Sequence, residues 1–154
     1  MKKLAILGST GSIGGNALEI VAQHPDKFRV VALAGGRNEQ KMGEQILRFS
    51  PELAAMMDPQ SARNLQERWP RKTIRILSGL EGLIAVASHP EAEMVVLAVV
   101  GSVGLLPALA VLQARKTLAL ANKESLVMAG EILIQEAKEK GARILPIDSE
   151  HSAI

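Results

Sequence analysis

A glycine-rich turn near the amino terminus is the first feature of the sequence that could do chemistry. Gly8, Gly11 and Gly14 are spaced G-x-x-G-x-x-G between the apolar run Lys3–Leu7 and the helical pattern Ile13–Gln23. Such glycines let the backbone turn sharply, expose N–H groups and bring the helix close to the strand; these N–H groups and the helix dipole suit a pyrophosphate. The turn predicts a dinucleotide-binding loop. The alternative is a glycine-rich strand–helix turn that holds no ligand.

The end of the second apolar run, Phe28–Ala34, indicates which dinucleotide would bind. NAD sites usually place an acidic residue at this point for the ribose 2′-hydroxyl, and NADP sites place a basic residue for the 2′-phosphate. Here the residues are Gly35, Gly36, Arg37 and Asn38, with no carboxylate among them. Arg37 can act as a planar donor fork on the phosphate, and Asn38 can cap the next helix. We therefore expect NADPH, the alternative being that Arg37 is a solvated loop charge.

A lysine between two polar residues follows a later apolar run. Asn122, Lys123 and Glu124 come directly after Thr117–Ala121, at the carboxyl end of an expected strand, where open α/β sheets bind ligands. The first turn of a helix would explain the asparagine as a cap and the glutamate as favourable to the dipole. It would not explain Lys123, because a cation is unfavourable at that end. We expect this group to contact a ligand.

Two carboxylates follow the last apolar run, Arg143–Ile147. Asp148 and Glu150 are two residues apart, so in an extended chain both side chains point to the same side and can converge on one ion. Carboxylates without thiolates suit Mg²⁺ or Mn²⁺. Two ligands are too few for an octahedral ion, and alternation turns His151 away from the pair. The pattern alone is also typical of a solvated turn.

The elements that must position these residues alternate between strands and helices. Strands are expected at Lys3–Leu7, Phe28–Ala34, Leu53–Met57, Ile74–Leu77, Met94–Val99, Thr117–Ala121 and Arg143–Ile147. Helices are expected at Ile13–Gln23, Leu80–Ser88, Leu105–Ala114 and Glu124–Lys140, and from the caps Asn38 and Asp58 to about Phe49 and Arg68. In the first helix the inner face is expected to carry Ile13, Ala17, Ile20 and Val21. The alternation predicts one α/β domain over residues 1–154, a doubly wound, Rossmann-like parallel sheet with helices on both faces.

Composition excludes several classes of protein. The 154 residues are 47% apolar and 22% charged, as in a globular chain. Nucleic-acid binding is not indicated, because the net charge is only +2 and the aromatic residues are one Trp and two Phe, with no Tyr. The absence of cysteine excludes disulfides and thiolate chemistry and leads us to expect the cytoplasm. The uncharged run Met94–Leu112 is long enough to span a bilayer, but Gly101, Ser102, Gly104 and Pro107 favour a strand, a turn and a helix, so we expect no membrane.

Four separated blocks resemble one enzyme family. They are ILGSTGSIG at 6–14, FRVVAL followed by GGRN at 35–38, LANKESLV at 120–127 and LPIDSEHSAI at 145–154. Their order and spacing are similar to those of 1-deoxy-D-xylulose 5-phosphate reductoisomerases of the non-mevalonate isoprenoid pathway. The resemblance covers the whole chain but only the front part of the family's polypeptide, whose members are about two and a half times longer.

The resemblance implies a reaction and a set of roles. The family rearranges 1-deoxy-D-xylulose 5-phosphate, a sugar phosphate, and reduces the product to 2-C-methyl-D-erythritol 4-phosphate with NADPH and a divalent cation. The implied NADPH-binding residues are Thr10, Gly11, Ser12, Ile13, Gly36, Arg37, Asn38, Asn122 and Glu124. The implied substrate-binding residues are Lys123, Ser149 and Glu150, of which Lys123 and Glu150 would be catalytic. The implied metal ligands are Asp148 and Glu150.

The family's further metal-binding glutamate, mobile loop and phosphate-binding residues would lie beyond Ile154. We therefore expect this chain alone to bind NADPH without turnover, and the full-length enzyme to be a homodimer. A stand-alone NADP-binding sensor or regulatory module would explain the glycine loop and Arg37 equally well, but it needs neither Lys123 nor the pair Asp148 and Glu150. Another NADP reductase, such as a semialdehyde dehydrogenase, would use a cysteine nucleophile, and the chain has none.

Overall fold

The computed structural model describes residues 1–69, 74–121 and 123–147. Its strands are β1 (Lys2–Leu7), β2 (Phe28–Gly35), β3 (Leu53–Met56), β4 (Arg75–Ser78), β5 (Met94–Leu97), β6 (Thr117–Leu120) and β7 (Arg143–Pro146). Its helices are α1 (Ser12–Gln23), α2 (Glu39–Phe49), α3 (Pro59–Arg68), α4 (Gly79–Ala87), α5 (Leu105–Gln113) and α6 (Lys123–Lys140), with a 3₁₀ turn, η1 (Ser102–Gly104), before α5. Each predicted strand and helix is present, and most ends agree within one or two residues.

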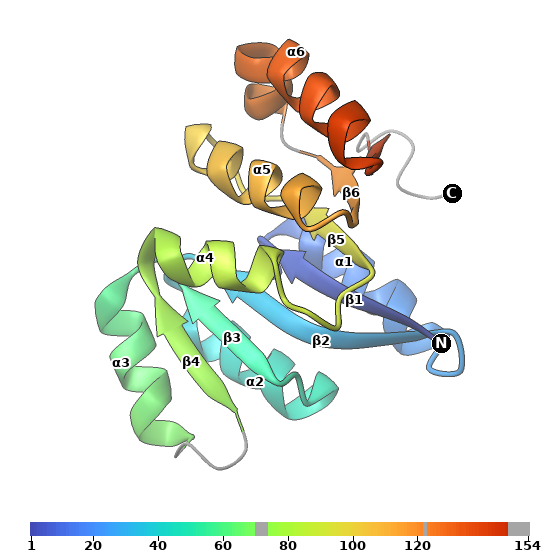
Figure 1. The fold of residues 1–154 in the computed structure, drawn as a ribbon. Coiled ribbons are helices and arrows are strands. Elements are labelled where there is room, and N and C mark those ends of the chain that lie inside the picture. Colours follow the sequence, from blue (N-terminus) through green and yellow to red (C-terminus); the bar gives the residue numbers. More distant parts are fainter. Residues whose placement is uncertain (70–73, 122, 148–154) are drawn as a thin grey trace.

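The described strands form one seven-stranded sheet in the order β4-β3-β2-β1-β5-β6-β7, and every neighbouring pair is parallel (Figure 1). From β1 the chain builds outward through β2, β3 and β4. Helix α4 then contacts β4, β3, β2 and β1 in turn and returns the chain to β5, on the other side of β1. This order confirms the predicted doubly wound α/β fold. It also places a topological switch point between β1 and β5, where such sheets bind ligands.

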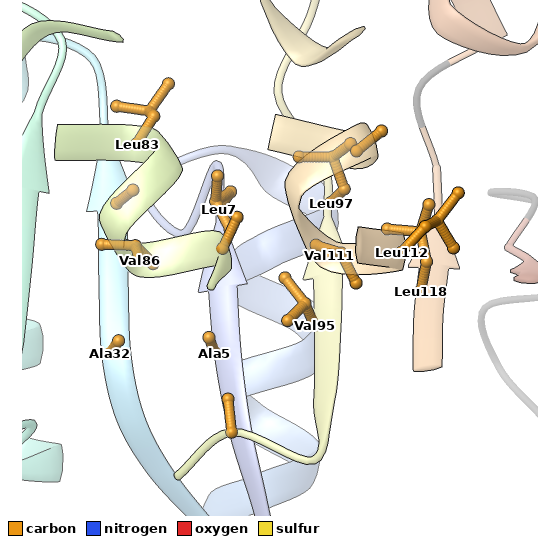
Figure 2. Close-up of a cluster of buried hydrophobic side chains, with 14 of the residues drawn as sticks. Ala5, Leu7, Ala32, Leu83, Val86, Val95, Leu97, Val111, Leu112 and Leu118 are labelled. Carbon is orange, nitrogen blue, oxygen red and sulfur yellow. The ribbon is translucent and has the colours of Figure 1, made fainter. Parts of the chain in front are cut away.

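The sheet is buried on both faces, which explains why its central strands are nearly continuous apolar runs. In β1, Leu4 and Ile6 belong to the core cluster under α1, α2 and α3, whereas Ala5 and Leu7 belong to the cluster under α4, α5 and α6. Figure 2 shows the second cluster, in which Leu7 lies among side chains of α4 and β5. Because successive strand residues point to opposite faces, one strand supplies both cores.

The first helix faces the sheet differently from the prediction. Ile20 is 42% exposed, so its expected place on the inner face is wrong. Val21 is buried as predicted, and the other buried positions are Gly14 and Leu18. The helix rotates to this face because its backbone approaches the sheet at Gly14, where there is no side chain.

The structure corrects the prediction for one further segment and confirms it for another. Helix α6 was predicted as one helix, but Ala129 leaves the helical conformation at φ −141° and ψ 28°, directly before Gly130, a weak helix former. The uncharged run Met94–Leu112 folds as β5, η1 and most of α5. Over the described ranges, none of the helices is long and apolar enough to cross a membrane.

Candidate functional site

The predicted glycine loop lies at the switch point, where it presses against the end of β5. Gly8 has φ +83°, and a Cβ at this position would lie 2.5 Å from the carbonyl oxygen of Ala98. At Gly14 a Cβ would overlap the backbone carbonyl of Gly8, whereas at Gly11 it would meet that oxygen at 3.5 Å, an ordinary contact. Gly8 and Gly14 are therefore required by close backbone approach. They bring the start of α1 against the end of β1.

The amino terminus of α1 is open in a way that suits an anion. Its N-cap is Gly11, which offers no side-chain acceptor, and its first turn holds no acidic residue. The first N–H groups of a helix have no intrahelical partner, so those of Ser12, Ile13 and Gly14 point outward with the positive end of the dipole. In contrast, the side chains of Asn38 and Asp58 cap α2 and α3. This geometry fits the pyrophosphate of a dinucleotide.

Buried polar groups hold the glycine loop from behind. The N–H groups of Gly8 and Ser9 both donate to the carbonyl of Ala34, at 2.8 and 3.0 Å. The Gln45 amide nitrogen donates to the carbonyl of Ser9 at 2.8 Å, which ties α2 to the loop. Gln45 is 8% exposed, and within the described part of the chain its Oε1 has no hydrogen-bond partner. Sequence reasoning missed this glutamine because a polar residue in an amphipathic helix is usually on the solvent side.

The predicted second loop, Gly36–Asn38, lies beside the first. A Cβ at Gly35 would lie 3.2 Å from the Thr10 hydroxyl oxygen, so the end of β2 rests against the glycine loop. Gly36, Arg37 and Asn38 are all exposed. Asn38 Oδ1 accepts the N–H of Lys41 at 3.0 Å, which confirms its predicted capping of α2. Arg37 is therefore outside the core, on a loop that neighbours the glycine loop.

The start of α3 supports the second loop from its other side. Asp58 Oδ2 accepts the N–H of Ser61 at 3.0 Å, which confirms the predicted cap. The N–H and hydroxyl of Ser61 hold the pKa of the Asp58 carboxyl below its ordinary value, and the charges of Arg37 and Arg63 lower it further. The Ser61 hydroxyl also lies 3.0 Å from the carbonyl oxygen of Arg37. Sequence reasoning recognised the cap but not its contact with the second loop, Gly36–Asn38, which we call the arginine loop.

The other predicted site residues follow β6 and β7. Helix α6 begins at Lys123, just beyond Ala121, whose N–H donates to the carbonyl of Leu97 at the end of β5. The backbone of Ala121 therefore lies at the edge of the sheet where both loops are found. Asn122, Asp148, Ser149 and Glu150 lie outside the described residues. Their roles, with those of Lys123 and Glu124, stay predictions. Among the described residues there is no group of three or more His, Asp or Glu side chains that could hold a metal ion.

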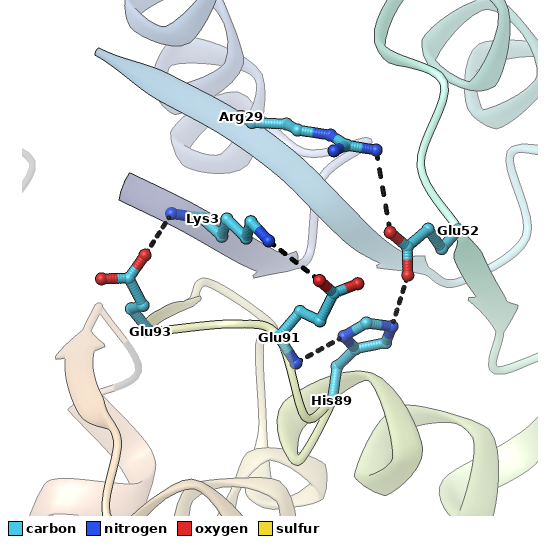
Figure 3. A network of polar contacts seen from close by, with 6 residues as sticks. All are labelled: Lys3, Arg29, Glu52, His89, Glu91 and Glu93. Atoms are coloured by element: carbon cyan, nitrogen blue, oxygen red, sulfur yellow. Dashed lines mark hydrogen bonds and ion pairs between the residues drawn. The ribbon is translucent and has the colours of Figure 1, made fainter. Parts of the chain in front are cut away.

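A second polar cluster lies at the opposite edge of the sheet, at the amino ends of the strands (Figure 3). Lys3 Nζ is 2.8 Å from Glu91 Oε1, and this pairing lowers the pKa of the Glu91 carboxyl. His89 Nε2 lies 3.5 Å from Glu52 Oε2. The carboxylates are exposed, and exposed ion pairs contribute little to stability. This cluster joins strand starts and faces away from the switch point, so we assign it to structure.

Comparison with known proteins gives one consistent family. A family model described as 1-deoxy-D-xylulose 5-phosphate reductoisomerase matches residues 4–130. The curated 1-deoxy-D-xylulose 5-phosphate reductoisomerase of Geotalea uraniireducens (strain Rf4) is 52% identical over the whole of this chain. The chain spans about 40% of the length of that relative.

Solved structures agree with the sequence comparisons. A DOX-P reductoisomerase in complex with NADPH, fosmidomycin and magnesium superimposes with a TM-score of 0.92 at 45% identity, over 98% of this chain and 37% of that one. The 1-deoxy-D-xylulose 5-phosphate reductoisomerase from Zymomonas mobilis, in complex with NADPH, superimposes with a TM-score of 0.91 at 35% identity. The match covers 97% of this chain and 39% of that one. The chain therefore belongs to the 1-deoxy-D-xylulose 5-phosphate reductoisomerase family and corresponds to its amino-terminal part.

Proposed function

We propose that this chain is the NADPH-binding domain of an enzyme that rearranges 1-deoxy-D-xylulose 5-phosphate and reduces it to 2-C-methyl-D-erythritol 4-phosphate. One observation supports the proposal most strongly: an uncapped helix start, packed onto a strand by Gly8 and Gly14, lies beside an exposed arginine loop. A dinucleotide with a 2′-phosphate carries the two anionic groups that these features fit. The NADPH in two solved relatives supports the same assignment.

The proposal gives each loop residue a task. The N–H groups of Ser12 and Ile13 bind the pyrophosphate, and Gly11 leaves the backbone accessible. The Arg37 guanidinium donates to the 2′-phosphate, with Gly36 and Asn38 shaping its loop. From the family resemblance, Thr10, Asn122 and Glu124 would also contact the cofactor. When bound, NADPH supplies the hydride for the reduction, and the protein orients it.

The metal and substrate residues are proposed from the family resemblance. Asp148 and Glu150 would hold a divalent cation, Mg²⁺ or Mn²⁺, which serves as Lewis acid and template for the substrate oxygens. Magnesium in the solved relatives supports this proposal. Lys123, Ser149 and Glu150 would contact the sugar-phosphate substrate. In the complete enzyme, which the resemblance implies is a homodimer, further residues would complete the metal shell and bind the substrate phosphate.

A polypeptide of these 154 residues is expected to bind NADPH and to show no turnover. Binding needs the two loops described above, whereas turnover also needs a complete metal shell, and two carboxylates are too few for an octahedral ion. Isothermal titration with NADPH and an assay of substrate-dependent NADPH oxidation in Mg²⁺ test both parts. Saturable binding without oxidation is the predicted result. Oxidation by the purified polypeptide would contradict the second part, and an absence of binding would contradict the first.

A further inference from the structure

The hydroxyl of Ser61 is in a position to control the selectivity of the arginine loop. Ser61 is in the first turn of α3 and only 6% exposed. Its Oγ lies 3.0 Å from the carbonyl oxygen of Arg37 and 2.9 Å from Asp58 Oδ2. One hydroxyl proton cannot serve both acceptors at once. Because Asp58 Oδ2 already accepts the N–H of Ser61, the hydroxyl can donate to Arg37 without leaving the carboxylate unpaired.

The arginine loop is held mainly through its backbone. The carbonyl of Gly36 accepts the N–H of Asp58 at 3.1 Å, and the carbonyl of Arg37 accepts the N–H of Glu39 at 2.8 Å. Of these bonds to the Gly36 and Arg37 carbonyls, that of Ser61 is the one made by a side chain. It therefore fixes the peptide unit that carries Arg37 while the guanidinium stays outside in solvent. Removing it would free the arginine without removing its charge.

The carboxylate of Asp58 adds an electrostatic component. The positive charges of Arg37 and Arg63 lower the pKa of the Asp58 carboxyl, so this carboxylate and the arginine loop interact electrostatically. The N–H of Ser61 donates to the oxygen of Asp58 that faces the cap, and this bond remains when the hydroxyl donates to Arg37. With its charge held in this way, Asp58 is less able to capture the guanidinium that a phosphate would need.

We propose that Ser61 is a positioning residue that makes the arginine loop selective for the 2′-phosphate of NADPH over NADH. This inference rests on the proposed NADPH binding and adds a determinant outside the loop itself. Ser61 does not touch the cofactor in this account; it acts through the Arg37 carbonyl. Loss of the Ser61 hydroxyl therefore lowers the affinity for NADPH, which carries the 2′-phosphate, and leaves the affinity for NADH unchanged.

The test is titration of the 154-residue chain with NADPH and with NADH, for wild type, Ser61→Ala and Asn64→Ala. Ser61→Ala is expected to weaken NADPH binding about fivefold, in line with one neutral hydrogen bond, and to change NADH binding by less than about twofold. Asn64→Ala is the matched control. Asn64 also joins α3 to α2, through Glu39 at 2.9 and 3.1 Å, but makes no bond to the Arg37 carbonyl. It is expected to keep the wild-type ratio of affinities.

The outcomes separate this inference from the proposed function. A wild-type chain that shows no preference for NADPH would contradict the proposed function itself. A wild-type preference that Ser61→Ala leaves unchanged, or an equal loss for both nucleotides, would overturn the role of Ser61. If Ser61→Ala does not fold, Ser61→Cys provides the test, because a thiol is a weak donor of similar size and should also lower the ratio.

Discussion

Replacing Gly14 by alanine is expected to destabilise the fold by about 3 kcal/mol and to abolish NADPH binding. The new Cβ would overlap the backbone carbonyl of Gly8, and neither backbone can move aside without separating α1 from β1. Both the helix start and the strand end belong to the proposed pyrophosphate site. Urea denaturation measures the free energy of unfolding, and titration with NADPH measures the binding.

The adjacent glycine provides a matched control. A Cβ at Gly15 would meet nothing within 4 Å, and alanine is the better helix former, so Gly15→Ala is expected to stabilise the chain by about 0.5–1 kcal/mol. The same chemical change one residue apart thus has opposite predicted signs. Equal effects of the two substitutions would show that the close approach of α1 to Gly8 does not matter.

Replacing Arg37 by aspartate is expected to weaken NADPH binding about 100-fold and to reverse the preference toward NADH. The loss combines a charge-assisted hydrogen bond with repulsion between the carboxylate and the 2′-phosphate. The gain follows because an acidic residue at this point can accept the ribose 2′-hydroxyl. Titration of the wild-type and variant chains with both nucleotides measures the change.

A control for charge alone is available at the opposite edge of the sheet. Arg75 is exposed at the start of β4, so Arg75→Asp makes the same change in net charge at the amino ends of the strands. It is expected to change NADPH affinity by less than about twofold, since exposed charges far from the site are screened. Equal NADPH affinity before and after Arg37→Asp would show that Arg37 does not contact the nucleotide.

Glycines, helix caps and apolar runs predicted most of the fold, because these local signals indicate the same boundaries for each strand and helix. The elements begin and end as expected at Gly8 and Gly11 before α1, at the caps Asn38 and Asp58, and at Gly141 after α6. Buried strands read as apolar runs, and helices between them require parallel pairing. The inner face of α1 was one exception, and the break in α6 at Ala129 was another. Apolar periodicity pointed to Ile20, but the helix faces the sheet at Gly14, and periodicity carries no signal for a residue without a side chain.

The site was predictable only as far as its residues lie at strand ends. Arg37 and the glycine loop follow β2 and β1 directly, so their position in sequence already places them at the carboxyl edge. Gln45 and Ser61 were missed because each acts on a loop that is distant in sequence, through one hydrogen bond to a backbone carbonyl. Such bonds depend on how helices pack, and a polar residue on a helix usually faces solvent. The two caps gave a partial signal for Ser61, since Asp58 had already marked the start of α3.

The crystal structure of this chain grown with saturating NADPH tests the central claim most directly. The account predicts pyrophosphate oxygens within hydrogen-bond distance of the Ser12 and Ile13 N–H groups, with the 2′-phosphate against the Arg37 guanidinium. A nucleotide bound elsewhere on the chain, or a crevice filled by the protein's own side chains at the same NADPH concentration, would contradict it.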